Sequence, residues 1–194
     1  MRKETGLTLI EILVVIGVFS GLMSVIAGIF ISNSRIQRRG IAVQKALGET
    51  SYAVEYMTRS MRMAKSDDDG DCLDSGYEYY TYQVRNGGEE VRYIDYRDRC
   101  VNFVFDYDEG AIKKGLRTNG TWEEYYLTSE VLNVNNLHFS TNVSPDSGTA
   151  DLFEEQPAVT LVMELEETET GQWGTRVQTS VTRRKLDIQR DTDD

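Results

Sequence analysis

The sequence predicts an α+β fold, with one long amino-terminal helix followed by an antiparallel β-sheet. An apolar run at residues 7–31 leads into a stripe of apolar and small residues at 43–64, with no proline between them. This pattern predicts a single helix of about 55 residues. From residue 77 onward, short runs rich in β-branched and aromatic residues alternate with turn-forming Asn and Gly, which predicts strands joined by hairpin turns.

The first half of the helix is apolar on all sides and carries a single charge, Glu11, between Leu7 and Ile31. A run of about 20 apolar residues is long enough to cross a bilayer as a helix. A carboxylate inside such a helix costs roughly 2.5–3.5 kcal/mol at mid-span, less near an end, and calls for a partner. Gly17 and Gly21 form a small-xxx-small pattern that permits close helix contact in lipid, although such pairs are also common by chance.

The second half of the helix, residues 32–66, is amphipathic. Its apolar or small residues recur at alternating steps of four and three, at Val43, Leu47, Thr50, Val54, Met57, Met61 and Ala64. This spacing draws one stripe along a helix, which we expect to lie on the sheet. A coiled coil is the alternative interpretation, but the heptad run is short and strands follow it.

Residues 67–190 are expected to form a β-rich domain. Strands are predicted at residues 77–84, 91–96, 100–107, 137–141, 159–165 and 175–188, with turns at 86–88, 108–110, 118–121 and 168–174. Four tyrosines in the first predicted strand form either one core face or an exposed aromatic patch for binding, namely Tyr77, Tyr79, Tyr80 and Tyr82. Residues 191–194 are expected to be a disordered tail.

An acidic segment ends the helix. Asp67, Asp69 and Asp71 surround Gly70 and are a candidate Ca²⁺ site, because Ca²⁺ takes several oxygen ligands from a flexible loop. The segment lacks the full EF-hand spacing and its distal glutamate, so a solvated acidic turn is the other interpretation. No other cofactor is expected.

The two cysteines, Cys72 and Cys100, would form a disulfide if the domain is exported, and would otherwise be two buried thiols. Closing a loop of this length stabilises a fold by about 3–4 kcal/mol in the chain-entropy model. Neither a CxxC pair nor a histidine cluster accompanies them, so the pattern does not indicate zinc.

Composition and motifs favour a non-enzymatic protein with neither a nucleic acid nor a small-molecule substrate as partner. The net charge of −11 opposes binding to phosphate backbones. The sole histidine, His138, falls in a predicted strand, and neither a nucleophile elbow nor a phosphate-binding P-loop is found.

The segment Gly6-Leu7-Thr8-Leu9-Ile10-Glu11 and the apolar helix after it resemble the class III signal of type IV prepilins and type II secretion pseudopilins. The resemblance implies a pilin-like fold, a leader at residues 1–6, cleavage between Gly6 and Leu7, and N-methylation of Leu7. It makes Glu11 the acid that pairs with an amino terminus during assembly. Leu7 departs from the usual Phe or Met. A secretory signal peptide and a simple membrane anchor are the alternatives, but the apolar run is too long for the first and the Gly–Glu spacing is not needed for the second.

By this resemblance the chain is a structural minor subunit of a type II secretion pseudopilus or a type IV pilus, closest to the J-type minor pseudopilin or the W-type minor pilin. The expected partners are other pseudopilins or pilins, the prepilin peptidase and the inner-membrane assembly platform. The expected location is the cytoplasmic membrane, crossed once, with the carboxy-terminal domain outside the cytoplasm, and then the filament. The rival hypothesis is a membrane-anchored extracytoplasmic binding or enzymatic domain.

Overall fold

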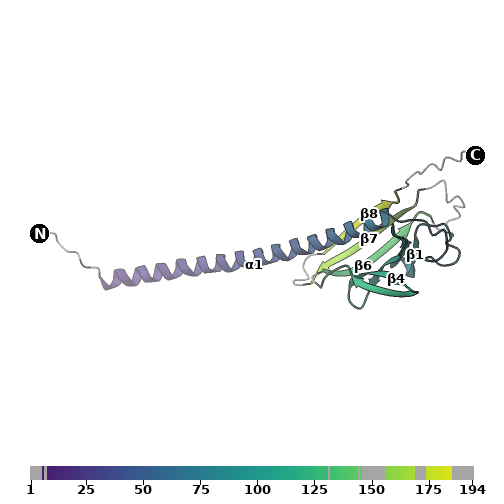
Figure 1. The fold of residues 1–194 in the computed structure, drawn as a ribbon. Helices are drawn as coiled ribbons and strands as arrows, with labels where there is room; N and C mark the ends of the chain where they lie inside the picture. The colour runs from purple at the N-terminus through teal and green to yellow at the C-terminus, as the bar shows by residue number, and fades with distance from the viewer. Residues whose placement is uncertain are drawn as a thin grey trace, which may run out of the picture. The chain divides into compact units, whose positions relative to one another are not determined.

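The structure is a computed structural model that describes residues 6, 8–130, 132–143, 145, 156–168 and 174–184. It divides into two compact units, Met1–Ala42 and Val43–Asp194. Helix α1, Leu9–Arg62, belongs to both units and is 54 residues long (Figure 1). The long helix predicted from the sequence is therefore confirmed. Most of the expected leader and the expected tail at 191–194 lie outside the described residues.

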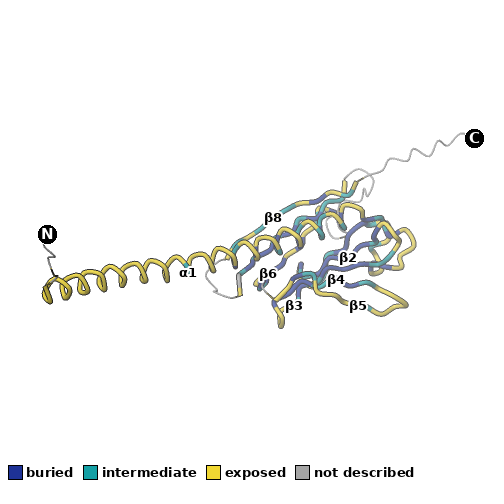
Figure 2. Tube along the Cα trace, turned by 60° about the vertical axis from the view of Figure 1, so that its left-hand side comes forward, coloured by how far each residue is buried: buried dark blue, intermediate teal, exposed yellow. Residues whose placement is uncertain are grey.

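In the first unit, the side chains of α1 are exposed from residue 9 to residue 41 except at the half-buried Ser34 (Figure 2). The exposed positions include nearly all of the large apolar residues of the run, such as Leu13, Phe19 and Phe30. A helix that is apolar on all sides and exposed throughout suits a membrane or a helical assembly better than water.

In the second unit, the remainder of α1 buries one face in the core. Met57 and Met61 are fully buried on this face, as the sequence predicted. Leu47, also predicted on it, is instead 45% exposed, and Ala46 and Ala53 are buried beside the methionines. Alanine at these positions allows the helix backbone to approach the sheets closely. The buried stripe is therefore narrower than the predicted one and slightly rotated from it around the helix.

Within the described ranges, eight antiparallel strands follow the helix and form two sheets rather than one. The five-stranded sheet has the order β1-β2-β3-β4-β5 and the three-stranded sheet the order β6-β7-β8. A short 3₁₀ segment, η1 (Asn86–Gly88), joins β1 to β2. The strands are β1 (Gln83–Arg85), β2 (Glu90–Ile94), β3 (Cys100–Asp106), β4 (Ala111–Thr118), β5 (Thr121–Tyr126), β6 (Leu132–Thr141), β7 (Ala158–Glu167) and β8 (Gly174–Thr182).

The strand predicted at residues 77–84 is wrong over most of its length, because residues 77–82 form turns and bends. Tyr79 has a φ of 72°, which no strand accommodates, and the Tyr80 N–H donates to the Tyr77 carbonyl in a turn. Only the end of this segment pairs with β2, as β1. The turn predicted at 118–121 is confirmed: Asn119 and Gly120 have φ values of 52° and 82°, as a two-residue hairpin turn requires.

The core of the second unit lies where α1 meets both sheets. The five-stranded sheet contributes fully buried side chains such as Tyr93 and Phe103 to this core, and the three-stranded sheet contributes Leu161 and Met163. The inward positions of β7 are alternate residues, as expected of a sheet with one face on the core.

Two buried tyrosines satisfy polar groups at the end of α1. The Tyr82 hydroxyl donates to the Met61 carbonyl at 2.6 Å, and the Tyr93 hydroxyl lies 2.6 Å from Ser60 Oγ. The Met61 carbonyl lies in the last turn of α1, where carbonyls lack the usual partner within the helix, and it accepts from the Ala64 N–H at 3.0 Å as well as from Tyr82. Burial raises the pKa of both phenols well above that of a free tyrosine, so both hydroxyls stay protonated and neutral.

Candidate functional site

Gly6 precedes the first residue of α1, Leu9, by three positions and is exposed. A Cβ built on it would meet no atom within 4 Å, so Gly6 itself is uncovered by the described residues. The helix begins with the Thr8 carbonyl, which accepts from the Glu11 and Ile12 N–H groups at 3.1 and 3.3 Å. Leu7, the predicted first residue after cleavage and the predicted methylation site, lies outside the described residues.

Glu11 lies in the first turn of α1 and is exposed between large apolar side chains. Leu9 and Ile10 are 78% and 70% exposed. A carboxylate in the first turn interacts favourably with the helix dipole, but only by about 0.3–1 kcal/mol. Within the described residues Glu11 has no cation within salt-bridge distance, so its charge remains available to a group from outside that part of the chain.

Helix α1 includes a stretch that is long and apolar enough to cross a membrane, and none of this stretch is buried in the structure. At 1.5 Å per residue, the 23 residues Leu9–Ile31 extend about 34 Å along the helix axis, close to the ~30 Å hydrocarbon thickness of a bilayer. Gly17 and Gly21 lie within this length, and a Cβ on either would meet no atom in the structure, so their predicted role in helix contacts stays a prediction.

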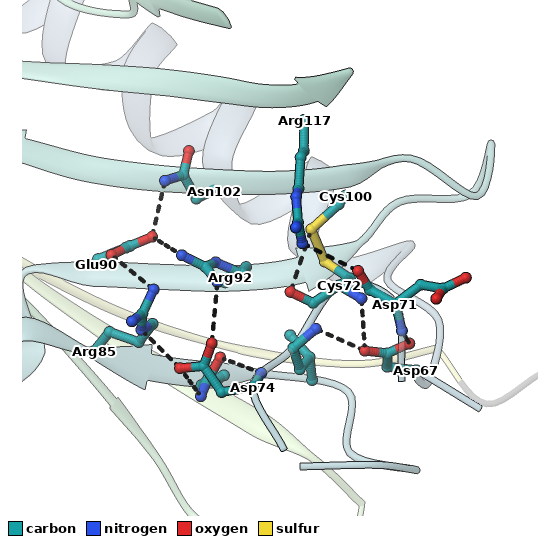
Figure 3. Close-up of polar contacts among 12 residues, drawn as sticks. Asp67, Asp71, Cys72, Asp74, Arg85, Glu90, Arg92, Cys100, Asn102 and Arg117 are labelled. Carbon is teal, nitrogen blue, oxygen red and sulfur yellow. Dashed lines mark hydrogen bonds and ion pairs between the residues drawn. A yellow bond between two sulfur atoms is a disulfide. The ribbon is translucent and has the colours of Figure 1, made fainter. Parts of the chain in front are cut away.

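The three acids of the calcium candidate do not converge. Asp67 is fully buried, whereas Asp69 and Asp71 are exposed. The Asp67 carboxylate accepts three backbone N–H groups, from Asp71 at 3.1 Å, Cys72 at 3.0 Å and Leu73 at 2.7 Å (Figure 3). In the part of the chain that the structure describes, no group of three acidic, histidine or cysteine side chains is placed to hold a metal ion. Asp67 therefore organises the loop after α1 with its oxygens turned inward.

A disulfide joins Cys72 to Cys100, the pairing expected from the sequence for an exported domain. It ties the loop after α1 to the first residue of β3, with the two Cα atoms 5.3 Å apart. Together with the Asp67 carboxylate, the disulfide fixes a segment that has no regular secondary structure.

A buried polar network on the five-stranded sheet was not predicted from the sequence. Glu90 accepts from Arg92 Nη2 at 3.1 Å and from Asn102 Nδ2 at 2.8 Å, and all three side chains are buried (Figure 3). Arg92 also lies 3.5 Å from Asp74 of the loop and stacks on the Trp122 ring. The alternation of Glu90 and Arg92 with apolar Val91 and Tyr93 indicates a polar sheet face, but its burial depends on segments that pack on it in the folded chain, the loop with Asp74 and the Trp122 ring of β5.

This network connects the loop to the sheet through Arg92 and Asp74. Gly115 lies beneath it, and a Cβ there would come within 2.1 Å of Asn102 Oδ1, so only glycine fits. Arg92 Nε and Asn102 Oδ1 have no hydrogen-bond partner among the described residues. The attraction within a buried ion pair of this kind is largely offset by the cost of removing both charges from water, so the pair adds little net stability.

The remaining predicted residues do not assemble into a catalytic set. His138 is exposed on β6, and a Cβ on Gly88 would meet its ring, so the imidazole covers η1. Of the four tyrosines, Tyr82 is in the core and Tyr79 is 59% exposed. Tyr77 and Tyr80 pack edge to face, with their ring centroids 5.6 Å apart. They therefore form neither one core face nor one exposed patch.

The chain matches no model of a known protein family, and a search of curated proteins finds no relative of it.

Proposed function

We propose that this protein is a minor pseudopilin or minor pilin, a non-enzymatic subunit that assembles through α1 into a type II secretion pseudopilus or a type IV pilus. The observation that carries the proposal is the order of features at the amino terminus. An exposed Gly6 is followed, five residues on, by the only charge of an exposed apolar helix segment. A J-type pseudopilin or a W-type pilin is the subtype that we propose.

The first step is maturation. We propose that the prepilin peptidase cleaves between Gly6 and Leu7 on the cytoplasmic side and that the new amino group of Leu7 is methylated. The exposed glycine supports this step, because a residue with no side chain leaves the backbone accessible to a protease. The second unit, with its disulfide, would lie outside the cytoplasm, where disulfides persist.

The second step is assembly through charge pairing. Cleavage creates a cationic amine one helical turn before Glu11, the distance at which residues i and i+4 meet on a helix. Two opposite unit charges about 4 Å apart attract by about 4 kcal/mol at an effective dielectric constant of 20. This is comparable to the roughly 2.5–3.5 kcal/mol that an unpaired carboxylate costs within a membrane. Glu11 would therefore pair with the amine of its own chain or of a neighbouring subunit. This pairing would fix the axial register between helices as the subunit leaves the lipid and joins a filament of other pilins on the assembly platform.

Mass spectrometry of the amino terminus of protein from its native host tests maturation. We expect N-methylated Leu7 as the first residue, and we expect Gly6→Ala to leave the leader attached. Gly40→Ala is the matched control, because Gly40 is also exposed and a Cβ there meets no atom. A mature chain that still begins with Met1, or one that has lost the whole apolar segment, would contradict the proposal.

Recovery in sheared filaments tests the role of Glu11. Glu11→Gln removes the charge at nearly constant shape and should abolish incorporation while leaving membrane insertion intact. Glu55→Gln is the control, since Glu55 is an exposed acid of the same helix beyond the apolar segment. Incorporation of the Glu11 variant at the wild-type level would refute charge pairing.

A further inference from the structure

The charges of this protein are distributed unevenly between its two units. Residues 1–42 carry five basic and two acidic side chains, whereas residues 43–194 carry sixteen basic and thirty acidic side chains. Between Glu11 and Glu49 no acid occurs at all, yet Arg35, Arg38 and Arg39 fall within five residues of one another there. This basic cluster stands apart in a chain with a net charge of −11.

The three arginines share one face of α1. At 3.6 residues per turn, positions 35, 38 and 39 fall within an arc of about 100° and about 6 Å of axial rise. All three side chains are exposed. Among the described residues, none of them forms a salt bridge. The cluster is therefore a compact cationic surface that the described protein leaves uncovered.

The cluster begins directly beyond the apolar segment. Arg35 lies about 6 Å and Arg39 about 12 Å along the axis from Ile31, at 1.5 Å per residue. The polar layer on each side of a bilayer is about 5–8 Å thick, from the difference between the hydrocarbon and total thickness. Helical side chains also tilt toward the amino terminus, and long arginine side chains extend toward the membrane surface, so the guanidinium groups reach back into that layer.

We propose that Arg35, Arg38 and Arg39 form a binding surface for the phosphate groups of anionic phospholipids. The guanidinium group suits this partner because its planar fork donates two parallel hydrogen bonds to a phosphate. The inference rests on the membrane-spanning part of the proposed function and adds a lipid partner to it. These contacts hold α1 at a fixed depth, and they are broken when the helix leaves the bilayer.

Electron spin resonance of the full chain in vesicles tests this surface. The protein is placed in phosphatidylcholine vesicles with a trace of spin-labelled phosphatidylglycerol or, in parallel, spin-labelled phosphatidylcholine. We expect the anionic label to be motionally restricted by the wild type several-fold more than the neutral label. Each arginine contributes up to about fivefold, which corresponds to about 1 kcal/mol near a membrane surface. The combined variant Arg35→Gln, Arg38→Gln and Arg39→Gln should lose this preference.

Lys45→Gln is the matched control. Lys45 is exposed on the same helix, but it lies about 21 Å beyond Ile31, outside the headgroup layer. We expect this variant to keep the full preference and added salt to weaken it. Equal restriction of the two labels by the wild type would overturn the proposal. The proposal would also be overturned if the Lys45 variant lost as much of the preference for the anionic label as the triple variant does. The same holds if the triple variant kept this preference and changed only the self-association of the protein.

Flotation of the same proteins with unlabelled vesicles separates this inference from the function on which it rests. Wild type and the triple variant should both float with vesicles of phosphatidylcholine alone, because the apolar segment anchors them. A wild type that does not float would refute the membrane span and, with it, both proposals. A wild type that floats without preferring the anionic label would overturn the arginine surface and leave the span and the filament role intact.

Discussion

Replacement of Asp67 should unfold the second unit at a markedly lower temperature. This side chain is fully buried at the end of α1, and its two oxygens accept the N–H groups of Asp71, Cys72 and Leu73 at 3.1, 3.0 and 2.7 Å. The backbone of Asp67 also pairs with Tyr79 and Tyr80 across the loop. One carboxylate thus serves as the acceptor for a whole irregular segment.

The size of the effect follows from these three bonds. Hydrogen bonds to a charged group contribute about 1.5–3 kcal/mol each, and a buried donor left without a partner costs about 1–3 kcal/mol. The sum of the three hydrogen-bond free energies exceeds the expected loss of stability, because the loop is near the surface and water can reach the three N–H groups after the substitution. We expect Asp67→Ala to reduce the free energy of unfolding by about 3 kcal/mol, equivalent to about 6–12 °C in melting temperature for a chain of this size.

Thermal unfolding of the full chain in detergent, followed by near-ultraviolet circular dichroism, measures this shift. Asp69→Ala is the control, because Asp69 is an exposed acid of the same loop and should change the melting temperature by less than about 1–2 °C. The Asp67 variant should show the same deficit with or without added Ca²⁺. A melting temperature equal to that of the control would refute the assigned role of the carboxylate. A Ca²⁺-dependent stabilisation of the wild type, absent from the Asp67 variant, would instead support a Ca²⁺ site at this loop.

Three further predictions concern the second unit. Replacing both Cys72 and Cys100 with Ser should lower the free energy of unfolding by about 3.6 kcal/mol, the chain-entropy value for a loop of this length. Denaturant titration measures this loss, and a clearly smaller loss would contradict the entropic account. Burial holds the pKa of Tyr82 above that of an unfolded tyrosine, about 10, so stability is full below that pH and is lost as the pH rises above it. Tyr82→Phe should flatten this alkaline loss and cost about 1 kcal/mol at neutral pH, and an unchanged alkaline profile would contradict the assignment. Partial burial raises the pKa of Asp95, but hydrogen bonds from the Arg99 side chain and from two backbone N–H groups outweigh it, so the net pKa lies below its ordinary value. The stabilisation from Asp95 is therefore present above about pH 4 and is lost as the pH falls through the lower, folded-state pKa. Asp95→Asn should reduce that acid-dependent loss, as acid titration of unfolding would measure.

The long helix was predictable because its signals are local. An uninterrupted run without proline specifies a helix through backbone hydrogen bonds between residues four apart, and α1 has nearly the expected length. The strands were less predictable, since their partners are distant in sequence. Residues 77–82 have the composition of a strand, yet the turn that brings Tyr82 beneath α1 prevents pairing there. Strands β4 and β5 were not predicted, because much of their sequence is polar or charged; only the turn that connects them was.

Two features could be read from the sequence alone: the placement of Gly6 and Glu11 at the start of an apolar segment, and the basic cluster that follows it. Both are defined by spacing along one chain segment, which a helix converts directly into geometry. Only the tertiary structure decided that Asp67 faces inward as a loop acceptor while its acidic neighbours face solvent. It likewise decided that Glu90 and Arg92 are buried as a pair. The physical reason is that burial depends on segments folded from elsewhere, and a carboxylate has the same composition whether it meets water, a metal ion or three backbone N–H groups.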